Sequence, residues 1–207
     1  MKILYCGVLH SYWGITTEAQ YEVLHFIPTW QSMGHEVDMI DVWAADKEKL
    51  NKELLARAPL YDMLWCTIHL DEIYPETLDS LRKSTLLCGL QTDDHWRFDW
   101  VSITYSPHFD AWVSTVKERL PDYVTVPNSN PIYMPWGVNT SLFHPSEEKK
   151  DTSLHWFGQI YGDREEKLNY LKERIPLAHE TFLPIADLVS SMAKSYAIVN
   201  LSHGFIP

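Results

Sequence analysis

The chain has 207 residues, of which 45% are hydrophobic, and a formal net charge of -11 at pH 7. This length fits one large domain or two small ones, and the apolar runs are far shorter than the ~18 residues that a membrane span needs. The negative charge argues against general nucleic-acid binding, which depends on clustered Lys and Arg, and we expect a soluble, cytoplasmic protein.

Three cysteines lie in predicted buried strands, Cys6, Cys66 and Cys88. They have no CxxC spacing, so they predict core thiols and not a disulfide framework or a zinc site.

The chain begins with an apolar run, residues 2–8, that predicts a central parallel strand buried on both faces. In an open α/β sheet, ligands bind at the carboxyl ends of the strands. We therefore expect a ligand site to include residues of the following loop, namely His10, Ser11, Tyr12, Trp13 and Gly14. Thr17 and Gln20 predict a capping box for the next helix, which Gly34 ends.

Alternating strands and helices continue to about residue 134. Strands are predicted at 36–43, 61–69, 85–90 and 109–113, with weaker candidates at 123–126 and 132–134. Asp46 is expected to cap one helix, and Pro75 is expected in the first turn of another. The alternation predicts a doubly wound parallel sheet, whose fourth strand is followed at the ligand edge by Gln91, Thr92, Asp93, Asp94, His95 and Trp96.

The composition then changes. The segment Pro135-Trp136-Gly137-Val138-Asn139 and a charged run at 146–151 indicate a linker. We predict a first domain at 1–137, a linker at 138–151 and a second domain at 152–207. In the second domain a strand from about residue 153, a helix at 163–174, a segment at 177–182, a helix near 185–195 and a strand at 196–201 form a truncated α/β unit.

The second domain opens with a strand, a turn bracketed by Gly158 and Gly162, and a helix. Asp163 is predicted to cap this helix, with Glu166 as its capping-box partner. A helix start of this kind attracts anions, and Arg164 is suited to binding two phosphate oxygens. An ordinary strand-to-helix turn accounts for the same pattern.

Several segments together resemble GT-B-fold glycosyltransferases, most closely the group related to spore-maturation protein CgeB within the family 4 and group 1 glycosyltransferases. They are the opening strand MKILYCG, the loop Trp13-Gly14, the helix end MGHEV, Thr92-Asp93-Asp94 with Arg97-Phe98, the linker PWGVN with FHP, and the turn WFGQIYGDREE. The linker and the GDREE turn are the most specific parts of the resemblance.

The resemblance implies two Rossmann-like units, the second truncated, that bind an acceptor on the first and a nucleotide-sugar on the second. It implies no metal and no cofactor beyond the nucleotide-sugar substrate. By that resemblance the loop from His10 to Gly14, with Asp93, lies on the acceptor side. The donor and its phosphates would contact Gly158, Tyr161, Gly162, Asp163 and Arg164. Asn200 and Ser202 follow the last strand, and their position is equally compatible with a donor contact and with a plain loop end.

Inverting sugar transfer needs a base that deprotonates the acceptor hydroxyl. The candidates are Asp94, slightly favoured, then His10 and His95. Helix capping or turn hydrogen bonding by Asp93 and Asp94 is an equally good interpretation. A metal at Asp93, Asp94 and His95 is not expected, because adjacent residues seldom bind one ion without a distant third ligand. His155, inside a predicted strand, is expected to be a hydrogen-bonded structural imidazole.

The sequence departs from the family pattern because an acidic segment resembling R-x-F-E-x-x-A-x-G is absent before Pro207. Either a fragment or a natural short form is compatible with this. We predict a nucleotide-sugar-dependent glycosyltransferase. The alternatives are a non-catalytic nucleotide- or sugar-phosphate-binding module, and a flavodoxin-like single domain in which residues 136–207 pack on the first sheet. The acceptor, the donor and the oligomeric state are not specified by the sequence.

Overall fold

The computed structural model describes residues 1–10, 18–151, 153–160, 162–181 and 183–200. Contacts between residues divide the chain into two compact units, Met1–Asn139 and Thr140–Pro207. The predicted linker, residues 138–151, spans this division. Among the helices of the described residues, none has the length and apolar character that crossing a membrane requires.

The first unit is built on a parallel sheet of six strands in the order β2-β1-β3-β4-β5-β6. The strands are β1 (Lys2–Gly7), β2 (Glu36–Asp41), β3 (Met63–Thr67), β4 (Leu86–Gln91), β5 (Ala111–Ser114) and β6 (Pro131–Tyr133). The helices are α1 (Tyr21–Ser32), α2 (Lys47–Arg57), α3 (Pro75–Leu81), α4 (Asp94–Arg97) and α5 (Ile103–Tyr105). Short helical turns are η2 (Ala58–Leu60), η3 (Phe98–Ser102), η4 (Ser106–His108) and η5 (Lys117–Thr125).

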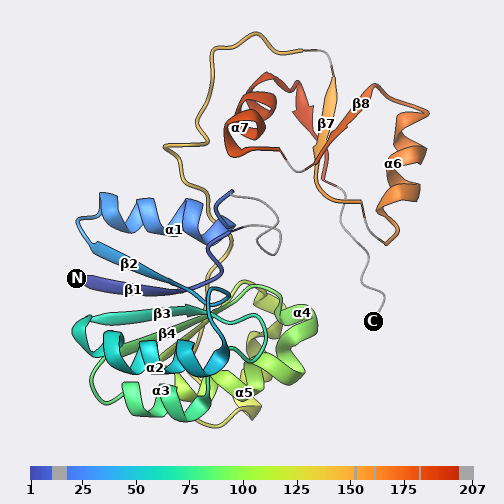
Figure 1. Ribbon diagram of the computed structural model, residues 1–207. Helices are drawn as coiled ribbons and strands as arrows, with labels where there is room; N and C mark the ends of the chain where they lie inside the picture. Colours follow the sequence, from blue (N-terminus) through green and yellow to red (C-terminus); the bar gives the residue numbers. More distant parts are fainter. Residues whose placement is uncertain (11–17, 152, 161, 182, 201–207) are drawn as a thin grey trace. The chain divides into compact units, whose positions relative to one another are not determined.

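Helices cover both faces of this sheet, with α1 on one face and α2 and α3 on the other (Figure 1). The prediction of a doubly wound parallel sheet is thereby confirmed, and β1 is an interior strand between the edge strand β2 and β3. From Ile3 to Gly7, β1 is buried, as its continuous apolar run predicts. The three cysteines are free, buried thiols. Burial raises the pKa of the Cys66 thiol, which keeps it protonated and unreactive, so we assign the cysteines to core packing.

Local signals place most helix ends correctly. The Asp46 carboxylate accepts a hydrogen bond from the Lys49 amide at 2.9 Å and caps α2, while α3 begins at Pro75. Gly34, just past the end of α1, has a φ of 85°, which glycine adopts without strain.

Two local predictions in the first unit are wrong. Gln20 is itself the N-cap residue of α1 and its side chain makes no capping hydrogen bond, so the predicted capping box is out of register; Thr17 lies outside the described residues. Residues 123–126 do not form a strand, because η5 continues to Thr125. Pro121 lies inside this turn and the Val124 side chain is 89% exposed, which removes the burial that a central strand needs.

The second unit has its own parallel sheet, with β7 (Leu154–Phe157), β8 (Leu177–Glu180) and β9 (Ala197–Ile198) in the order β8-β7-β9. Its helices, α6 (Arg164–Lys172) and α7 (Ile185–Lys194), lie on opposite faces of this sheet (Figure 1). A small core forms around Trp156, Leu168 and Leu177. This separate sheet rules against the alternative in which the second part of the chain is an irregular tail.

Candidate ligand-binding pocket

A pocket of about 420 Å³ lies at the carboxyl ends of the strands of the first sheet. Its lining residues follow strands β1 to β4, lie at the start of α1 or, in one case, follow β6. They are Val8, Gln20, Tyr21, Glu22, Trp43, His69, Thr92, Asp93 and Trp136. Strand β1 pairs with both β2 and β3, so the winding reverses direction beside it. Ligands of open α/β sheets bind at this kind of reversal, and the pocket lies where the topology predicts a ligand.

Glu22 is the most buried carboxylate of this pocket. It lies in the first turn of α1 and is 2% exposed, and its Oε2 atom has no hydrogen-bond partner among the described residues. Burial raises the pKa of Glu22, and the nearby Asp93 charge adds to this effect, although hydrogen bonds with the backbone and with Gln20 oppose it. A buried carboxylate oxygen without a donor is costly to keep.

His69, directly beyond β3, is held as a neutral imidazole. Burial, reinforced by the Arg97 charge, lowers its pKa to about 4. Arg97 Nη1 donates to the His69 carbonyl at 2.8 Å, and Arg97 Nη2 lies 3.6 Å from Asp93 Oδ2. Nδ1 of His69 is buried without a hydrogen-bond partner in the part of the chain that the structure describes. The ring therefore has a nitrogen that is available to a ligand.

A buried glutamine fixes this edge of the sheet. Gln91, the last residue of β4, donates through Nε2 to the Ile68 carbonyl at 3.0 Å. Its Oε1 accepts from the amides of Thr92 at 2.9 Å and Asp93 at 3.0 Å. These bonds tie the ends of β3 and β4 together and set the position from which the Asp93 side chain extends.

The PWGVN segment, which the sequence singled out as a linker, belongs to the first unit. The Tyr21 hydroxyl donates to the Gly137 carbonyl, and the ring centroids of Tyr21 and Trp136 lie 4.5 Å apart, edge to face. The Asn139 amide donates to His25 Nδ1 at 2.7 Å. The segment is thereby fixed along α1, and it places the indole of Trp136 in the pocket wall.

Of the predicted catalytic and acceptor residues of the first unit, Asp93 lines the pocket. His10 and His95 are exposed and do not line it. The loop residues Ser11, Tyr12, Trp13 and Gly14 lie outside the described residues.

The preference for Asp94 as the base needs correction. Its side chain is fully buried, and its two oxygens accept hydrogen bonds from the hydroxyls of Ser102 and, at 2.6 Å, Tyr123. Tyr123 in turn accepts from Trp112 Nε1 at 2.7 Å. Asp94 is part of a buried network that joins α4, η3 and η5 to the sheet, and this supports the structural interpretation of its side chain over the catalytic one.

In the second unit, the predicted donor turn connects β7 to α6. The Gly158 amide donates to the Glu180 carbonyl at 3.1 Å and its carbonyl accepts from His179 Nε2 at 2.8 Å, while Gly162 has a φ of 60°. Arg164 Nη1 donates to the Gln159 carbonyl at 3.2 Å, so the guanidinium bends back over the turn. Asn200 is exposed beyond β9. Tyr161 and Ser202 lie outside the described residues.

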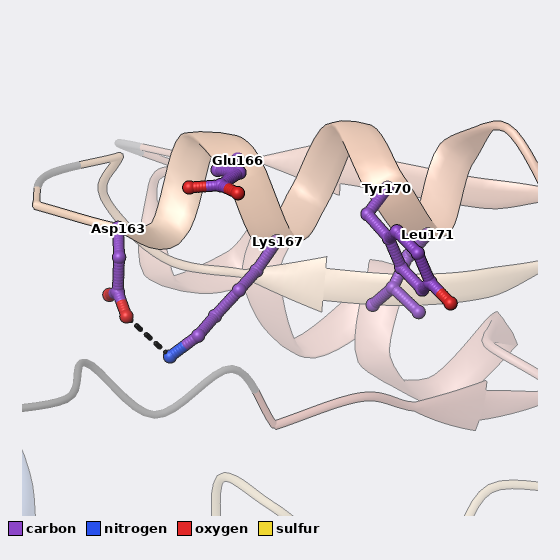
Figure 2. A pocket seen from close by; sticks show the side chains of 5 residues that line it. All are labelled: Asp163, Glu166, Lys167, Tyr170 and Leu171. Atoms are coloured by element: carbon purple, nitrogen blue, oxygen red, sulfur yellow. Dashed lines mark ion pairs between the residues drawn. The ribbon is translucent and has the colours of Figure 1, made fainter.

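Asp163 precedes α6, but the predicted capping box does not form. Its side chain makes no capping hydrogen bond with the helix, and its carboxylate pairs with Lys167 at 2.7 Å (Figure 2). A pocket of about 360 Å³ beside α6 is lined by Asp163, Glu166, Lys167, Tyr170 and Leu171 (Figure 2). An adjoining hollow also includes Glu165 and Glu173. This outer side of α6 is acidic, so it repels a diphosphate.

His155 is a satisfied structural imidazole, as its position in a strand predicts. Its Nδ1 lies 3.0 Å from Glu180 Oε1 and its Nε2 lies 3.1 Å from Asp151 Oδ2. The ring links β7 to β8 and to the segment before β7. Within the described residues, no cluster of three His, Cys, Asp or Glu side chains is arranged to hold a metal ion.

Sequence reasoning placed Thr92 and Asp93 at the ligand edge but missed the other seven pocket residues, among them Glu22, Trp43, His69 and Trp136. Trp43 and His69 were assigned to the ends of strands, Glu22 to the interior of a helix, and Trp136 to a linker. The available signal was their position, since Trp43 and His69 immediately follow strands and Glu22 is in the first turn of α1.

No protein-family model and no curated protein sequence matches the chain.

Proposed function

We propose that the chain is a nucleotide-sugar-dependent glycosyltransferase whose acceptor binds in the pocket of the first unit. The observation that carries this proposal is the combination of carboxylates and aromatic rings at the reversal point of the sheet, with Glu22 and Asp93 beside Tyr21, Trp43 and Trp136. Carboxylates accept hydrogen bonds from sugar hydroxyls, and aromatic rings pack against the apolar faces of sugars.

The donor is proposed to bind at the carboxyl edge of the second sheet. There the turn from Gly158 to Arg164 follows the central strand β7 and Asn200 follows the neighbouring strand β9. The amides at the start of α6 and the Arg164 guanidinium attract phosphate oxygens. The acidic flank of α6 confines such a ligand to the end of the helix, since its side repels phosphate.

Isothermal titration of the protein with UDP-, GDP- and ADP-sugars tests the donor half of the proposal. We expect one nucleotide class to bind and the sugar to be released or transferred when an acceptor is added. If none of the three classes binds, the glycosyltransferase proposal fails.

A second candidate function is a non-catalytic nucleotide- or sugar-phosphate-binding module. The self-contained turn between β7 and α6, with Gly162 at positive φ, favours it, because such a turn binds phosphate without a second substrate. This candidate predicts binding without turnover. Arg164→Ala should then weaken phosphate binding by about 1.5–3 kcal/mol, whereas Arg174→Ala, near the other end of α6, should have little effect.

A further inference from the structure

We infer that the pocket of the first unit binds a neutral saccharide ring, with Glu22 accepting a hydrogen bond from one of its hydroxyl groups. This names the substrate class of the proposed acceptor site and the residue that receives it. The role of the bound saccharide as the acceptor of a transferred sugar rests on the proposed function, whereas binding of the saccharide does not depend on transfer. Sequence patterns did not indicate Glu22, and its placement follows from the fold.

The first argument is the incomplete hydrogen bonding of Glu22. Glu22 lines the pocket with only 2% of its surface exposed, and its Oε2 atom has no hydrogen-bond partner among the described residues. Buried polar atoms in folded proteins are nearly always hydrogen-bonded. A ligand hydroxyl that enters the pocket supplies the missing donor.

The second argument is charge. Glu22 and Asp93 are both acidic, and the guanidinium of Arg97 is engaged by Asp93 and by the His69 carbonyl. His69 is neutral above pH 5, since its pKa is about 4. An anionic ligand such as a phosphate therefore meets repulsion here, and a hydroxyl donor does not.

The third argument is the shape of the remaining wall. Trp136 and Tyr21 meet edge to face at 4.5 Å, and the rings of Trp43 and His69 lie 6.1 Å apart. These rings give the pocket apolar surfaces next to its carboxylates. A pyranose ring has both properties, since its C–H groups pack on aromatic planes while its hydroxyls point outward. His69 Nδ1 offers a further hydrogen-bonding atom.

Saturation-transfer NMR with the full chain tests this inference. The probes are the methyl glycosides of glucose, galactose, mannose and N-acetylglucosamine, with glucosamine as a cationic comparison and glucose 6-phosphate as an anionic one. We expect at least one neutral glycoside to bind and glucose 6-phosphate to bind at least tenfold more weakly. Glu22→Gln should weaken glycoside binding about tenfold, because a charge-assisted hydrogen bond becomes a neutral one.

Glu36→Gln is the matched control, because Glu36 begins β2 at the opposite end of the strands and its side chain is 77% exposed. Trp136→Ala is a second variant that tests the same wall without changing charge, and it should also weaken binding. The inference is overturned if no neutral glycoside binds, if glucosamine alone binds, or if Glu22→Gln and Trp136→Ala both bind as the wild type does.

The two proposals fail separately. Glycoside binding without any nucleotide-sugar binding leaves this inference standing and removes the glycosyltransferase. Transfer from a nucleotide-sugar by a protein whose pocket variants retain full glycoside affinity overturns this inference alone.

Discussion

The two units wind in the same way but use their polar side chains differently. In each, the first strand lies between the second and the third, as β2-β1-β3 and β8-β7-β9. In the second unit, His155 has a carboxylate at each ring nitrogen and Asp163 pairs with Lys167. In the first, Glu22 and His69 each keep a buried atom without a partner in the described chain.

The same strand order thus accommodates ion pairs in the second unit and, in the first, pocket-lining residues with buried atoms that have no partner among the described residues. The second unit places ion pairs at His155 and Asp163, whereas the unpartnered atoms of Glu22 and His69 in the first unit belong to residues that line a pocket. Each of the following changes tests one side of this contrast.

The largest effect is expected from Asp94→Ala. Two buried hydroxyls, those of Ser102 and Tyr123, would lose their acceptor, so the first unit should lose about 3 kcal/mol of unfolding free energy. Urea unfolding followed by circular dichroism measures this, with exposed Asp99→Ala as the control. Full stability combined with loss of sugar transfer would instead return Asp94 to a catalytic role.

The next effect concerns pH and His69. Its pKa falls from 6.5 in the unfolded chain to about 4 in the folded unit, so below pH 6.5 the unfolded chain gains a proton that the folded one does not. Stability present above pH 6.5 should therefore decline by about 2–3 kcal/mol as the pH falls to 4. His69→Gln should flatten this decline and exposed His10→Gln should not. An unchanged pH profile in His69→Gln contradicts the buried, neutral ring.

A smaller loss is expected in the second unit from His155→Phe, which keeps the ring but removes both polar contacts. We expect about 1–2 kcal/mol. Trp156 is the single tryptophan of residues 140–207, but eight others lie in the first unit, so the unfolding of the second unit is best followed by NMR of the Trp156 indole. His144→Phe, at an exposed position, is the control. Equal stability of the two variants would mean that the carboxylate contacts do not hold β7 and β8 together.

The smallest effect is expected from Lys167→Ala. Its ion pair with Asp163 is half exposed, and such pairs contribute about 0.3–0.5 kcal/mol. Phosphate binding at the start of α6 should weaken more noticeably, because removal of the Lys167 charge makes this end of the helix more negative. Titration with inorganic pyrophosphate measures this, and stronger binding in Lys167→Ala would contradict a phosphate site there.

Much of the fold could be predicted because its signals are local. Continuous apolar runs mark β1, β3 and β4, and Asp46 and Pro75 mark helix starts through their own backbone chemistry. The prediction failed at residues 123–126, where a short apolar pattern lacked the burial of a strand, and at the capping boxes of α1 and α6, where the spacing fitted but the side-chain geometry did not.

The pocket was predictable only in part. The sheet edge and Asp93 followed from strand order, because residues after parallel strands meet at one edge. The roles of Asp94 and Glu22 did not follow, since each depends on burial by distant parts of the chain. Asp94 is enclosed by Ser102 and Tyr123, and Glu22 is buried when α1 packs beside the strand ends.

The buried Glu22 carboxylate has a consequence for directed evolution. Because its pKa is raised, the folded chain holds the proton more tightly than the unfolded one, and the stability of the first unit falls as the pH rises above 4.5. A neutral residue at this position removes that penalty near neutral pH. Selection for heat resistance alone should therefore enrich Glu22→Gln and give more stable proteins in which the proposed saccharide binding is weaker.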